Sequence, residues 1–385
     1  MLNIKKESEH LYINIGKLTL KIGLYRLFHL KKRSIVILEQ GGFGDYICCR
    51  HYFKYLKEKY RSYHIIYICQ DWTAQFSKIY DSNYIDEVIS FNRDKFKSEK
   101  LYRKLFLNYI NKTYNIEKYI HLTPFNIGIG KGGQLSWRIY LAKKIKAKEK
   151  YVPYMKYADK REPQLRFFNK PINIDKYLFC TDANKQFFEK ILNMQIGNDR
   201  EKIDVPAIYD RNISNVIVSI GASADFKMFP INKWIEIINY LTSEFQTIDR
   251  IIFIGTKSEK KFVDEILSKI NNLEKCLNLV GEIDISALPL FLKNTKLLIS
   301  MESGNTHLAE SLNCPTLCLC GGFYYKKSQP YVDTCIEYLY PPKFMEIVNS
   351  NDKEKIKEIY FDYDTLSVKD INSADVIQAI KKYLV

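Results

Sequence analysis

The most constraining feature of the sequence is a twofold alternation of short, β-branched apolar runs with helical segments. In the first half these runs lie at 34–40, 64–70, 85–91 and 116–122. In the second half they recur at 215–220, 250–255, 276–281, 296–300 and 315–322. Such alternation is typical of parallel sheets covered by helices on both faces. We therefore predict an α/β protein with two Rossmann-like, doubly wound domains facing a cleft, where ligands bind at the carboxyl ends of strands.

The domain boundary is predicted where this alternation is lost. Residues 150–212 are rich in Lys, Tyr, Asn and Pro and contain one expected helix, 183–194. A chain of 385 residues has room for two domains. We predict a basic segment, a first domain, a second domain and a C-terminal helix that packs back on the first domain, over 1–33, 34–200, 201–372 and 373–385.

The formal net charge of +15 is concentrated in two stretches of the first half. Residues 1–33 hold eight Lys and Arg against two Glu, and residues 131–170 hold twelve against three acids. A localised basic surface favours a polyanionic partner, such as an anionic membrane face or a phosphorylated glycolipid. No recognised nucleic-acid motif accompanies the charge, so we expect no nucleic-acid partner. Residues 12–30 fit an interfacial helix and an alternating strand equally well.

Cysteine usage and the start of the chain predict a cytoplasmic protein. The nine cysteines lack a disulfide-like spacing, and the first residues contain no apolar signal region. No window approaches 18 uninterrupted apolar residues, so we expect no membrane span, only peripheral contact with the inner membrane face. Cys314, Cys318, Cys320 and Cys335 lack a C-x-x-C pair, which favours core packing over metal binding. We expect no metal and no cofactor.

The strongest candidate site is the segment LLISMESGNTHLAESLNCPTLCL at 297–319. A buried strand is predicted to lead through a tight turn at Gly304 into a helix that begins near Asn305. The N–H groups and the positive end of such a helix favour a diphosphate. Capping alone would explain Ser, Asn and Thr here, but it would not require the acid, the glycine and the histidine together. We expect His307 to donate to a phosphate oxygen and Glu302 to accept from a sugar hydroxyl. The predicted site comprises Glu302, Ser303, Gly304, Asn305, Thr306 and His307.

A second candidate lies at 218–234, where a predicted strand runs into three small residues. Gly221, Ala222 and Ser223 would allow the backbone to approach a ligand closely. Lys227 follows them, and its ammonium group would neutralise a departing phosphate. The alternative interpretation is an ordinary surface lysine, because the chain is rich in lysine.

Two weaker candidates also follow predicted strands. Glu259, after the run 250–255, would hold a ribose or serve only as an acid at a helix N-terminus. Gly41, Gly42 and Gly44 form a turn after the first strand, although their order differs from the dinucleotide-binding fingerprint. Asp45 follows this turn, where it would act as a catalytic base or as a helix cap.

Taken in order, these segments resemble glycosyltransferase family 9, the ADP-heptose:lipopolysaccharide heptosyltransferase family, over residues 34–90 and 215–330. The most specific element is the family's D-S/T-G-x-x-H-L-A block, which resembles residues 302–309. Glu302 replaces the aspartate of this block, and Phe229 replaces a family tryptophan. The other matching elements are Gly44-Asp45, Lys227-Met228-Phe229-Pro230, the pair Gly255 and Glu259, and residues 311–316.

The resemblance implies a GT-B fold and an inverting, metal-independent glycosyltransferase. The expected donor is a nucleotide-diphosphate sugar, with ADP-heptose favoured, and the expected acceptor is a glycan of lipopolysaccharide, lipooligosaccharide or capsule. By the same resemblance, Asp45 is the general base on the acceptor side, next to the glycine loop. Lys227 and the backbone at 304–307 would stabilise the leaving diphosphate, while Glu259 and Glu302 would contact the donor. The first domain would then bind the acceptor and the second the donor.

Two other functions remain open at this point. The same donor chemistry would serve a glycosyltransferase that modifies a protein acceptor. A non-catalytic protein that binds a nucleotide sugar or a polyanion is an alternative of another class, and the replacement at Glu302 is its best support. A polyanion-binding protein would show a steep salt dependence and no requirement for Asp45.

Overall fold

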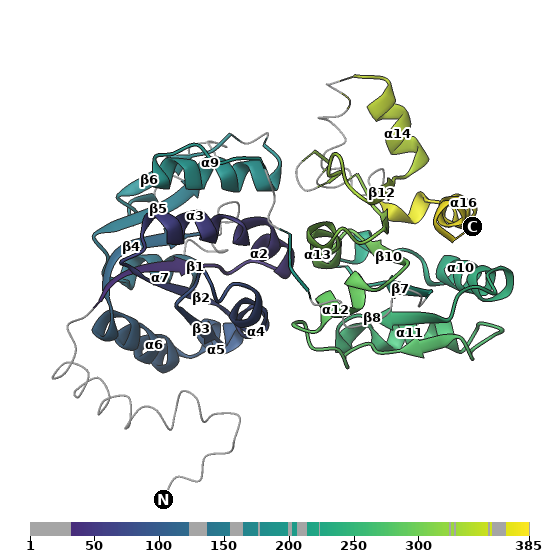
Figure 1. Ribbon diagram of the computed structural model, residues 1–385, viewed down its shortest axis with the longest axis horizontal. Helices are drawn as coiled ribbons and strands as arrows, with labels where there is room; N and C mark the ends of the chain where they lie inside the picture. The colour runs from purple at the N-terminus through teal and green to yellow at the C-terminus, as the bar shows by residue number, and fades with distance from the viewer. Residues whose placement is uncertain are drawn as a thin grey trace, which may run out of the picture. The chain divides into compact units, whose positions relative to one another are not determined.

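The computed structural model describes residues 32–122, 137–154, 165–175, 178–198, 202–205, 214–222, 224–322, 325–326, 329–352, 355 and 367–384. The chain divides into two compact units (Figure 1). The first unit comprises Met1–Gly41, Tyr52–Lys176 and Ala183–Ile196. The second comprises Gly42–His51, Tyr177–Asp182 and Gly197–Val385. Two short segments from the first half of the chain therefore belong to the second unit.

The first unit is built on a six-stranded sheet whose neighbouring strands are all parallel. The strand order is β3-β2-β1-β4-β5-β6, which is the doubly wound Rossmann order. The fold class predicted from the alternating pattern is therefore confirmed for this unit. Its strands are β1 (Arg33–Leu38), β2 (His64–Gln70), β3 (Glu87–Phe91), β4 (Asn115–His121), β5 (Glu149–Tyr154) and β6 (Lys170–Asn173).

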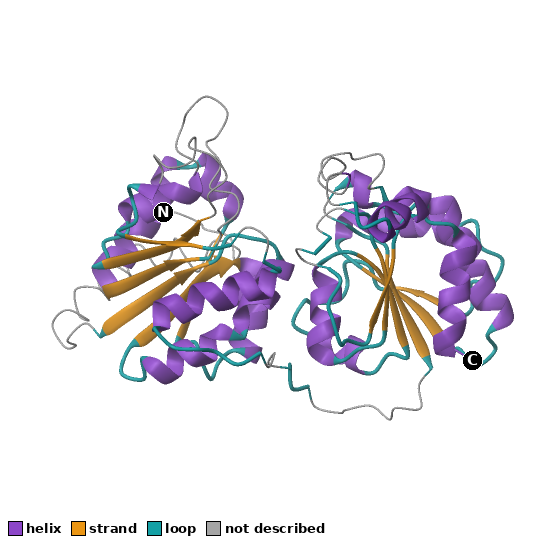
Figure 2. Ribbon diagram, turned by 90° about the horizontal axis from the view of Figure 1, so that it is seen from above, coloured by secondary structure: helices purple, strands orange, loops and turns teal. Residues whose placement is uncertain are grey.

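Helices cover both faces of this sheet, as Figure 2 shows. On one face Val36 of β1 belongs to a core that includes Phe106 of α6. On the other face the Tyr67 ring lies 5.3 Å from Phe53 of α3, which also contacts Phe188 of α9. Burial on both faces explains the nearly continuous apolar sequence of the central strands. The helices are α3 (Tyr52–Lys59), α4 (Asp71–Tyr80), α5 (Arg93–Ser98), α6 (Lys100–Thr113), α7 (Trp137–Lys144) and α9 (Cys180–Leu192), of which the first three residues of α9 belong to the second unit.

Strands β5 and β6 lie in the region where the sequence pattern predicted no further strands. Both occupy the edge of the sheet, where β6 pairs only with β5. In β6 the residues other than Ile172 are exposed, and the strand contains Pro171. Edge strands of this kind need no continuous apolar run, and proline is tolerated there. The alternation is therefore lost in the sequence although the sheet continues.

The second unit repeats the same architecture. Its sheet is again entirely parallel, with the order β12-β11-β10-β7-β8-β9. Counted within the unit, this is the same Rossmann order as in the first. The apolar run 315–322 was predicted to be the last strand, but β12 adds another at the edge. The strands are β7 (Asn215–Ser219), β8 (Arg250–Ile254), β9 (Cys276–Asn278), β10 (Leu297–Met301), β11 (Thr316–Leu319) and β12 (Ile336–Leu339).

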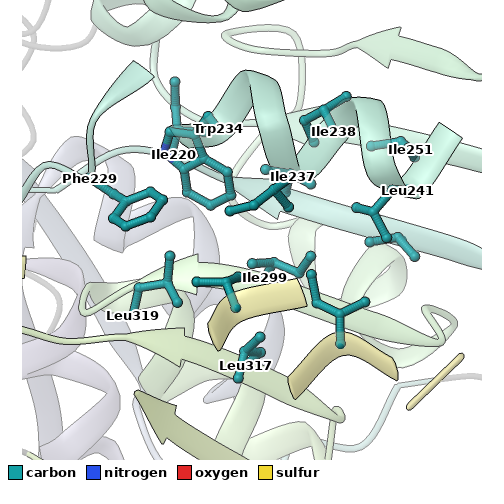
Figure 3. Close-up of a cluster of buried hydrophobic side chains, with 14 of the residues drawn as sticks. Ile220, Phe229, Trp234, Ile237, Ile238, Leu241, Ile251, Ile299, Leu317 and Leu319 are labelled. Atoms are coloured by element: carbon teal, nitrogen blue, oxygen red, sulfur yellow. The ribbon is translucent and has the colours of Figure 1, made fainter. Parts of the chain in front are cut away.

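The core of the second unit lies between one face of the sheet and helices α10, α11 and α16. Figure 3 shows Trp234 and Ile237 of α10 above Ile299 and Leu317 of the sheet. Phe229, which stands in place of the family tryptophan, lies in this core with its ring 5.4 Å from Trp234. The helices of this unit are α2 (Phe43–Arg50), α10 (Ile231–Glu244), α11 (Lys260–Leu267), α12 (Leu288–Lys293), α13 (Gly304–Leu312), α14 (Pro342–Asn349) and α16 (Ser373–Leu384), with short 3₁₀ turns at Asp225–Lys227, Lys257–Glu259 and Val368–Asp370.

The C-terminal helix α16 differs from its predicted position. We expected it to pack on the first domain, but Val376, Ile380 and Leu384 are buried in the core of the second unit. The Lys233 ammonium on α10 also donates to the Ile371 carbonyl, 2.6 Å away, just before α16. The amphipathic pattern of α16 predicted a buried face but did not identify which core receives it.

Several predicted features lie outside the described residues. They include Ser223, the first 31 residues of the basic N-terminal segment, and much of the basic stretch 131–170. In the part of the chain that the structure describes, no helix has both the length and the apolar character to cross a membrane.

Candidate functional site

The predicted donor residues gather where the strand order of the second sheet reverses. Strands β7 and β10 are neighbours, yet the chain continues from them toward opposite edges of the sheet. In open parallel sheets, ligands bind beyond the carboxyl ends of strands at such a switch point. Gly221 and Ala222 follow β7, and the turn at 302–307 follows β10. The topology therefore brings together two segments that are about 80 residues apart in the sequence.

The turn after β10 is held by its own side chains. The Ser303 hydroxyl caps α13 by accepting from the Asn305 N–H at 3.3 Å. The Thr306 hydroxyl is buried and donates to the Met301 carbonyl at 3.1 Å. The Asn305 amide donates to the Ser219 hydroxyl of β7 at 2.9 Å, which ties the two sides of the switch point together. Ser303 and Thr306 thus shape the turn, while the positive N-terminal end of α13 remains suited to a diphosphate.

Lys227 is not the exposed surface lysine of the alternative interpretation. It is only 8% exposed, and its ammonium forms an ion pair with Glu302. The two residues come from opposite sides of the switch point, after β7 and after β10. A cation is therefore fixed beside the start of α13, as the chemistry of a diphosphate site requires.

Glu259 caps a helix and places its carboxylate against the glycines that follow β7 and β8. Its carboxylate accepts from the Thr256 N–H at 2.7 Å, as expected for an acid at a helix N-terminus. The same carboxylate lies directly against Gly221 and Gly255, where any side chain would overlap it. The glycines after β7 and β8 are thus needed to seat this carboxylate between the two strand ends.

Helix α2 packs against the start of α13 within the second unit. A Cβ atom on Gly44 would lie 2.8 Å from Cδ2 of His307, and one on Gly304 would lie 3.1 Å from the Gly44 nitrogen. A side chain at Gly44 would therefore require the His307 ring to shift, and one at Gly304 would make a tighter contact than is usual. Asp45 sits on the first turn of α2, where its carboxylate accepts from the Gly42 N–H at 2.6 Å. The side chain of Asp45 is nevertheless exposed.

Gly41 belongs to the first unit and is held by two polar side chains that the sequence pattern did not single out. Its N–H donates to the Glu39 carboxylate, and its carbonyl accepts from the Gln70 amide at 2.9 Å. Glu39 and Gln70 are both buried. The glycine turn therefore begins in a fixed position at the end of β1.

His307 lies in a buried polar cluster. Its Nδ1 atom is 2.7 Å from the Tyr331 hydroxyl and 3.6 Å from the Cys48 sulfur. Burial by itself would lower the pKa of His307, but the Cys48 thiolate and the carboxylates of Glu302 and Asp45 raise this pKa to about 9. The imidazole is therefore positively charged at neutral pH and adds a second cation beside the α13 N-terminus.

Besides Glu39 and Gln70, four residues in contact with this region were not predicted as site residues: Ser219, Tyr331, Cys48 and Cys180, whose sulfur lies 3.3 Å from that of Cys48. Ser219 carries a weak signal, because it ends a strand at the switch point. Tyr331 and Cys180 carry none, since they reach the site from distant segments with no motif around them. Among the residues that the structure describes, no cluster of His, Cys, Asp or Glu suited to a metal ion was found.

Sequence comparison shows that part of the chain resembles a known family. Residues 173–342 match the family model of glycosyltransferase family 9 (heptosyltransferase). Over this range the chain is similar to glycosyltransferase family 9. The match confirms the family that the sequence motifs indicated, and it includes Lys227, Glu259 and the turn at 302–307. Asp45 and the glycine turn lie outside the matched range.

A curated relative agrees with this assignment. The chain is 26% identical over 170 residues to lipopolysaccharide heptosyltransferase 1 of Campylobacter coli. That alignment covers 40% of this chain and 50% of the relative, so the chain matches about half the length of that protein.

Solved structures share the fold of the chain. A glycosyl transferase family 9 protein from Veillonella parvula has a TM-score of 0.67 at 18% identity, covering 92% of this chain and 98% of its own. The E. coli heptosyltransferase WaaC with ADP has a TM-score of 0.67 at 15% identity, covering 91% and 99%. The E. coli ADP-heptose lps heptosyltransferase II has a TM-score of 0.64 at 15% identity, covering 91% and 98%. These similarities support the GT-B fold class predicted from the sequence.

Proposed function

We propose that this protein is a glycosyltransferase that transfers heptose from ADP-heptose to a glycan acceptor of lipopolysaccharide, lipooligosaccharide or capsule. The observation that carries the proposal is the heptosyltransferase family match, whose range contains the charged groups at the second switch point. The E. coli neighbour with ADP supports an adenine nucleotide as the donor base.

The donor is proposed to lie across the switch point of the second unit. Its diphosphate would sit at the N-terminus of α13, next to the Lys227 ammonium and the His307 imidazolium. Because Glu302 already fixes Lys227, this cation is oriented before the donor arrives. Glu259, seated between the ends of β7 and β8, would accept hydrogen bonds from the ribose hydroxyls.

Transfer is proposed to be inverting and independent of metal. Asp45 would remove the proton of the acceptor hydroxyl, whose oxygen then attacks the anomeric carbon as the bond to ADP breaks. Negative charge grows on the departing phosphate, where two cations and the helix N-terminus stabilise it. The Gly42 N–H already orients one carboxylate oxygen of Asp45.

The basic stretches 1–33 and 131–170 are proposed to hold a phosphorylated acceptor at the inner face of the membrane. In this proposal the protein is cytoplasmic and attaches to the membrane only at its surface. Binding to anionic vesicles that weakens with added salt would support this location, and equal binding to neutral vesicles would contradict it.

Nucleotide binding tests the donor site. ADP should raise the melting temperature of the protein more than UDP or GDP, since a ligand at 100 times its Kd adds about 2.7 kcal/mol of stability. Lys227→Ala should abolish the ADP effect, whereas Lys269→Ala, which removes an exposed lysine paired with Glu265, should preserve it. Stabilisation by UDP or GDP alone would overturn the proposed donor. Binding of ADP without any transfer would favour the non-catalytic alternative.

A further inference from the structure

Cys48 and Cys180 lie close enough to react with each other. They are 132 residues apart in the sequence, yet their sulfur atoms are separated by 3.3 Å. Cys48 lies on α2 and Cys180 is the first residue of α9, and both belong to the second unit. A disulfide has an S–S length of about 2.05 Å, so the sulfurs need to approach by only about 1.3 Å.

The groups around Cys48 favour its thiolate form. The hydrogen bond with Cys180 lowers the pKa of Cys48 most strongly, burial opposes this, and the His307 charge and the Tyr331 hydroxyl lower the pKa further. The pKa of Cys180 is raised, first by its hydrogen bond with Cys48 and then by burial. The Cys48 sulfur is thus prepared as a nucleophile. Cys180 remains a thiol, which can react with an oxidised Cys48 to form a disulfide.

We propose that Cys48 and Cys180 form a peroxide-reactive thiol pair that closes into a disulfide. Cys180 is only partly buried, while Cys48 is 6% exposed, so the oxidant must be as small as hydrogen peroxide. The pair is a modification site separate from the groups assigned to donor chemistry, but it shares His307 with them.

The reaction has two steps. The Cys48 thiolate attacks one oxygen of hydrogen peroxide, which breaks the O–O bond and gives a sulfenic acid at Cys48. The His307 imidazolium protonates the departing hydroxide to water. The Cys180 sulfur then attacks the Cys48 sulfur, the S–S bond forms, and the sulfenic hydroxyl leaves with the Cys180 proton as a second water. The two sulfurs lose two electrons in total, and the peroxide gains them.

A second cysteine pair in the same unit provides a matched control. The sulfurs of Cys318 and Cys320 are also 3.3 Å apart, and both residues are fully buried. Burial raises the pKa of Cys320, and the two sulfurs contact each other and the Thr306 hydroxyl, whereas Cys48 contacts the His307 imidazole. Distance alone would predict equal reactivity for the two pairs, whereas activation by His307 predicts a reaction at Cys48 and Cys180 only.

Closing the disulfide should also weaken donor binding, a consequence that rests on the proposed function. The Cys48 thiolate is a main cause of the raised pKa of His307. When Cys48 becomes part of a disulfide, this negative charge is lost, and burial then favours the neutral imidazole. One of the two cations beside the α13 N-terminus would disappear at neutral pH.

Peptide mapping of the full-length protein tests the pair directly. After brief treatment with stoichiometric hydrogen peroxide, non-reducing digestion and mass spectrometry should find a linked peptide containing Cys48 and Cys180. Dithiothreitol should reverse the link. Cys180→Ser should instead accumulate a sulfenic acid at Cys48 that dimedone traps, and Cys318→Ser should leave the link unchanged. Free thiols at both positions, a link between Cys318 and Cys320, or irreversible oxidation of Cys48 without a link would each overturn the proposal.

The effect on the donor site is measured separately. ADP affinity should fall several-fold in the oxidised protein and return after reduction, and Cys318→Ser, which keeps both Cys48 and Cys180, should show the same fall and the same recovery. If the link forms but the reduced protein does not bind ADP, the proposed function fails while the thiol pair stands. If ADP binds and no link forms, only the thiol pair fails.

Discussion

Lys227 and Glu302 form a buried ion pair across the switch point of the second sheet. The side chains are 10% and 13% exposed, and they follow β7 and β10 respectively. A glutamate at position 302, where the family has an aspartate, thus has a structural partner. Its carboxylate pairs with the ammonium of the buried Lys227.

Removing one member of this pair should be costly. Glu302→Ala leaves the Lys227 ammonium buried without its carboxylate, and we expect the free energy of unfolding to fall by about 3 kcal/mol. Urea denaturation monitored by circular dichroism measures this change. Glu337→Ala is the control, because its partner Lys382 is 60% exposed and surface pairs contribute about 1 kcal/mol or less. Equal losses in the two variants would contradict a special role for the buried pair.

The close approach of α2 to α13 predicts different effects for two glycines in one turn. Gly44→Ala places a methyl group 2.8 Å from His307 and should destabilise the protein by about 1–3 kcal/mol. Gly42→Ala meets only the Asp45 carboxylate, at an ordinary 3.6 Å, and should cost less than about 1 kcal/mol. Thermal denaturation of both variants measures the difference. A loss of stability of similar size in Gly42→Ala would show that the packing of α2 against α13 is not the cause of the destabilisation.

The charge on His307 should be visible in its titration. Its folded-state pKa is raised from 6.5 to about 9, so its protonation stabilises the folded protein fully below pH 6.5, and this contribution is lost as the pH rises through about 9. Nuclear magnetic resonance of the imidazole carbons measures this pKa. In Cys48→Ser the pKa should fall, because burial then acts without the thiolate. An unchanged pKa in that variant would contradict the thiolate–imidazolium pair.

Glu259 offers a test of the donor half that does not involve the lysine pair. Glu259→Gln keeps the shape of the side chain and an oxygen that can accept from Thr256, but it removes the negative charge. We expect ADP affinity to fall about tenfold or more, since charged hydrogen bonds contribute about 1.5–3 kcal/mol. Isothermal titration calorimetry with ADP measures the loss. Glu265→Gln, at an exposed pair with Lys269, should bind ADP normally.

Much of the fold was predictable because the central strands are buried on both faces. Strands such as β1 and β10 have sequences that are almost entirely apolar, and their alternation with helices specifies a parallel sheet. The edge strand β6 lacks such a run, so its sequence gives no comparable signal. The amphipathic α16 has a clear apolar face, but local periodicity does not say which core that face joins.

The candidate site was predictable only where residues that are adjacent in the sequence form it. The turn at 302–307 contains its own cap and glycine, so the motif and the geometry coincide. The contacts of His307 with Tyr331 and Cys48 depend on how distant segments fold together. The ion pair of Lys227 with Glu302 could not be predicted from the sequence either, because 75 residues separate the two. Asp45 stays a prediction as the base, because its observed contact with Gly42 is that of a helix cap.

The most direct test of the account is a transfer assay with Asp45→Asn. The asparagine keeps an oxygen that can accept from the Gly42 N–H, so α2 should remain capped. Wild-type protein given ADP-heptose and a heptose-deficient lipooligosaccharide should release ADP and add one heptosyl unit to the acceptor, seen by mass spectrometry. Asp45→Asn should bind ADP with unchanged affinity and lose transfer by about 100-fold or more, the usual contribution of a general base. Transfer by Asp45→Asn at the wild-type rate, or no transfer by the wild type, would contradict the account.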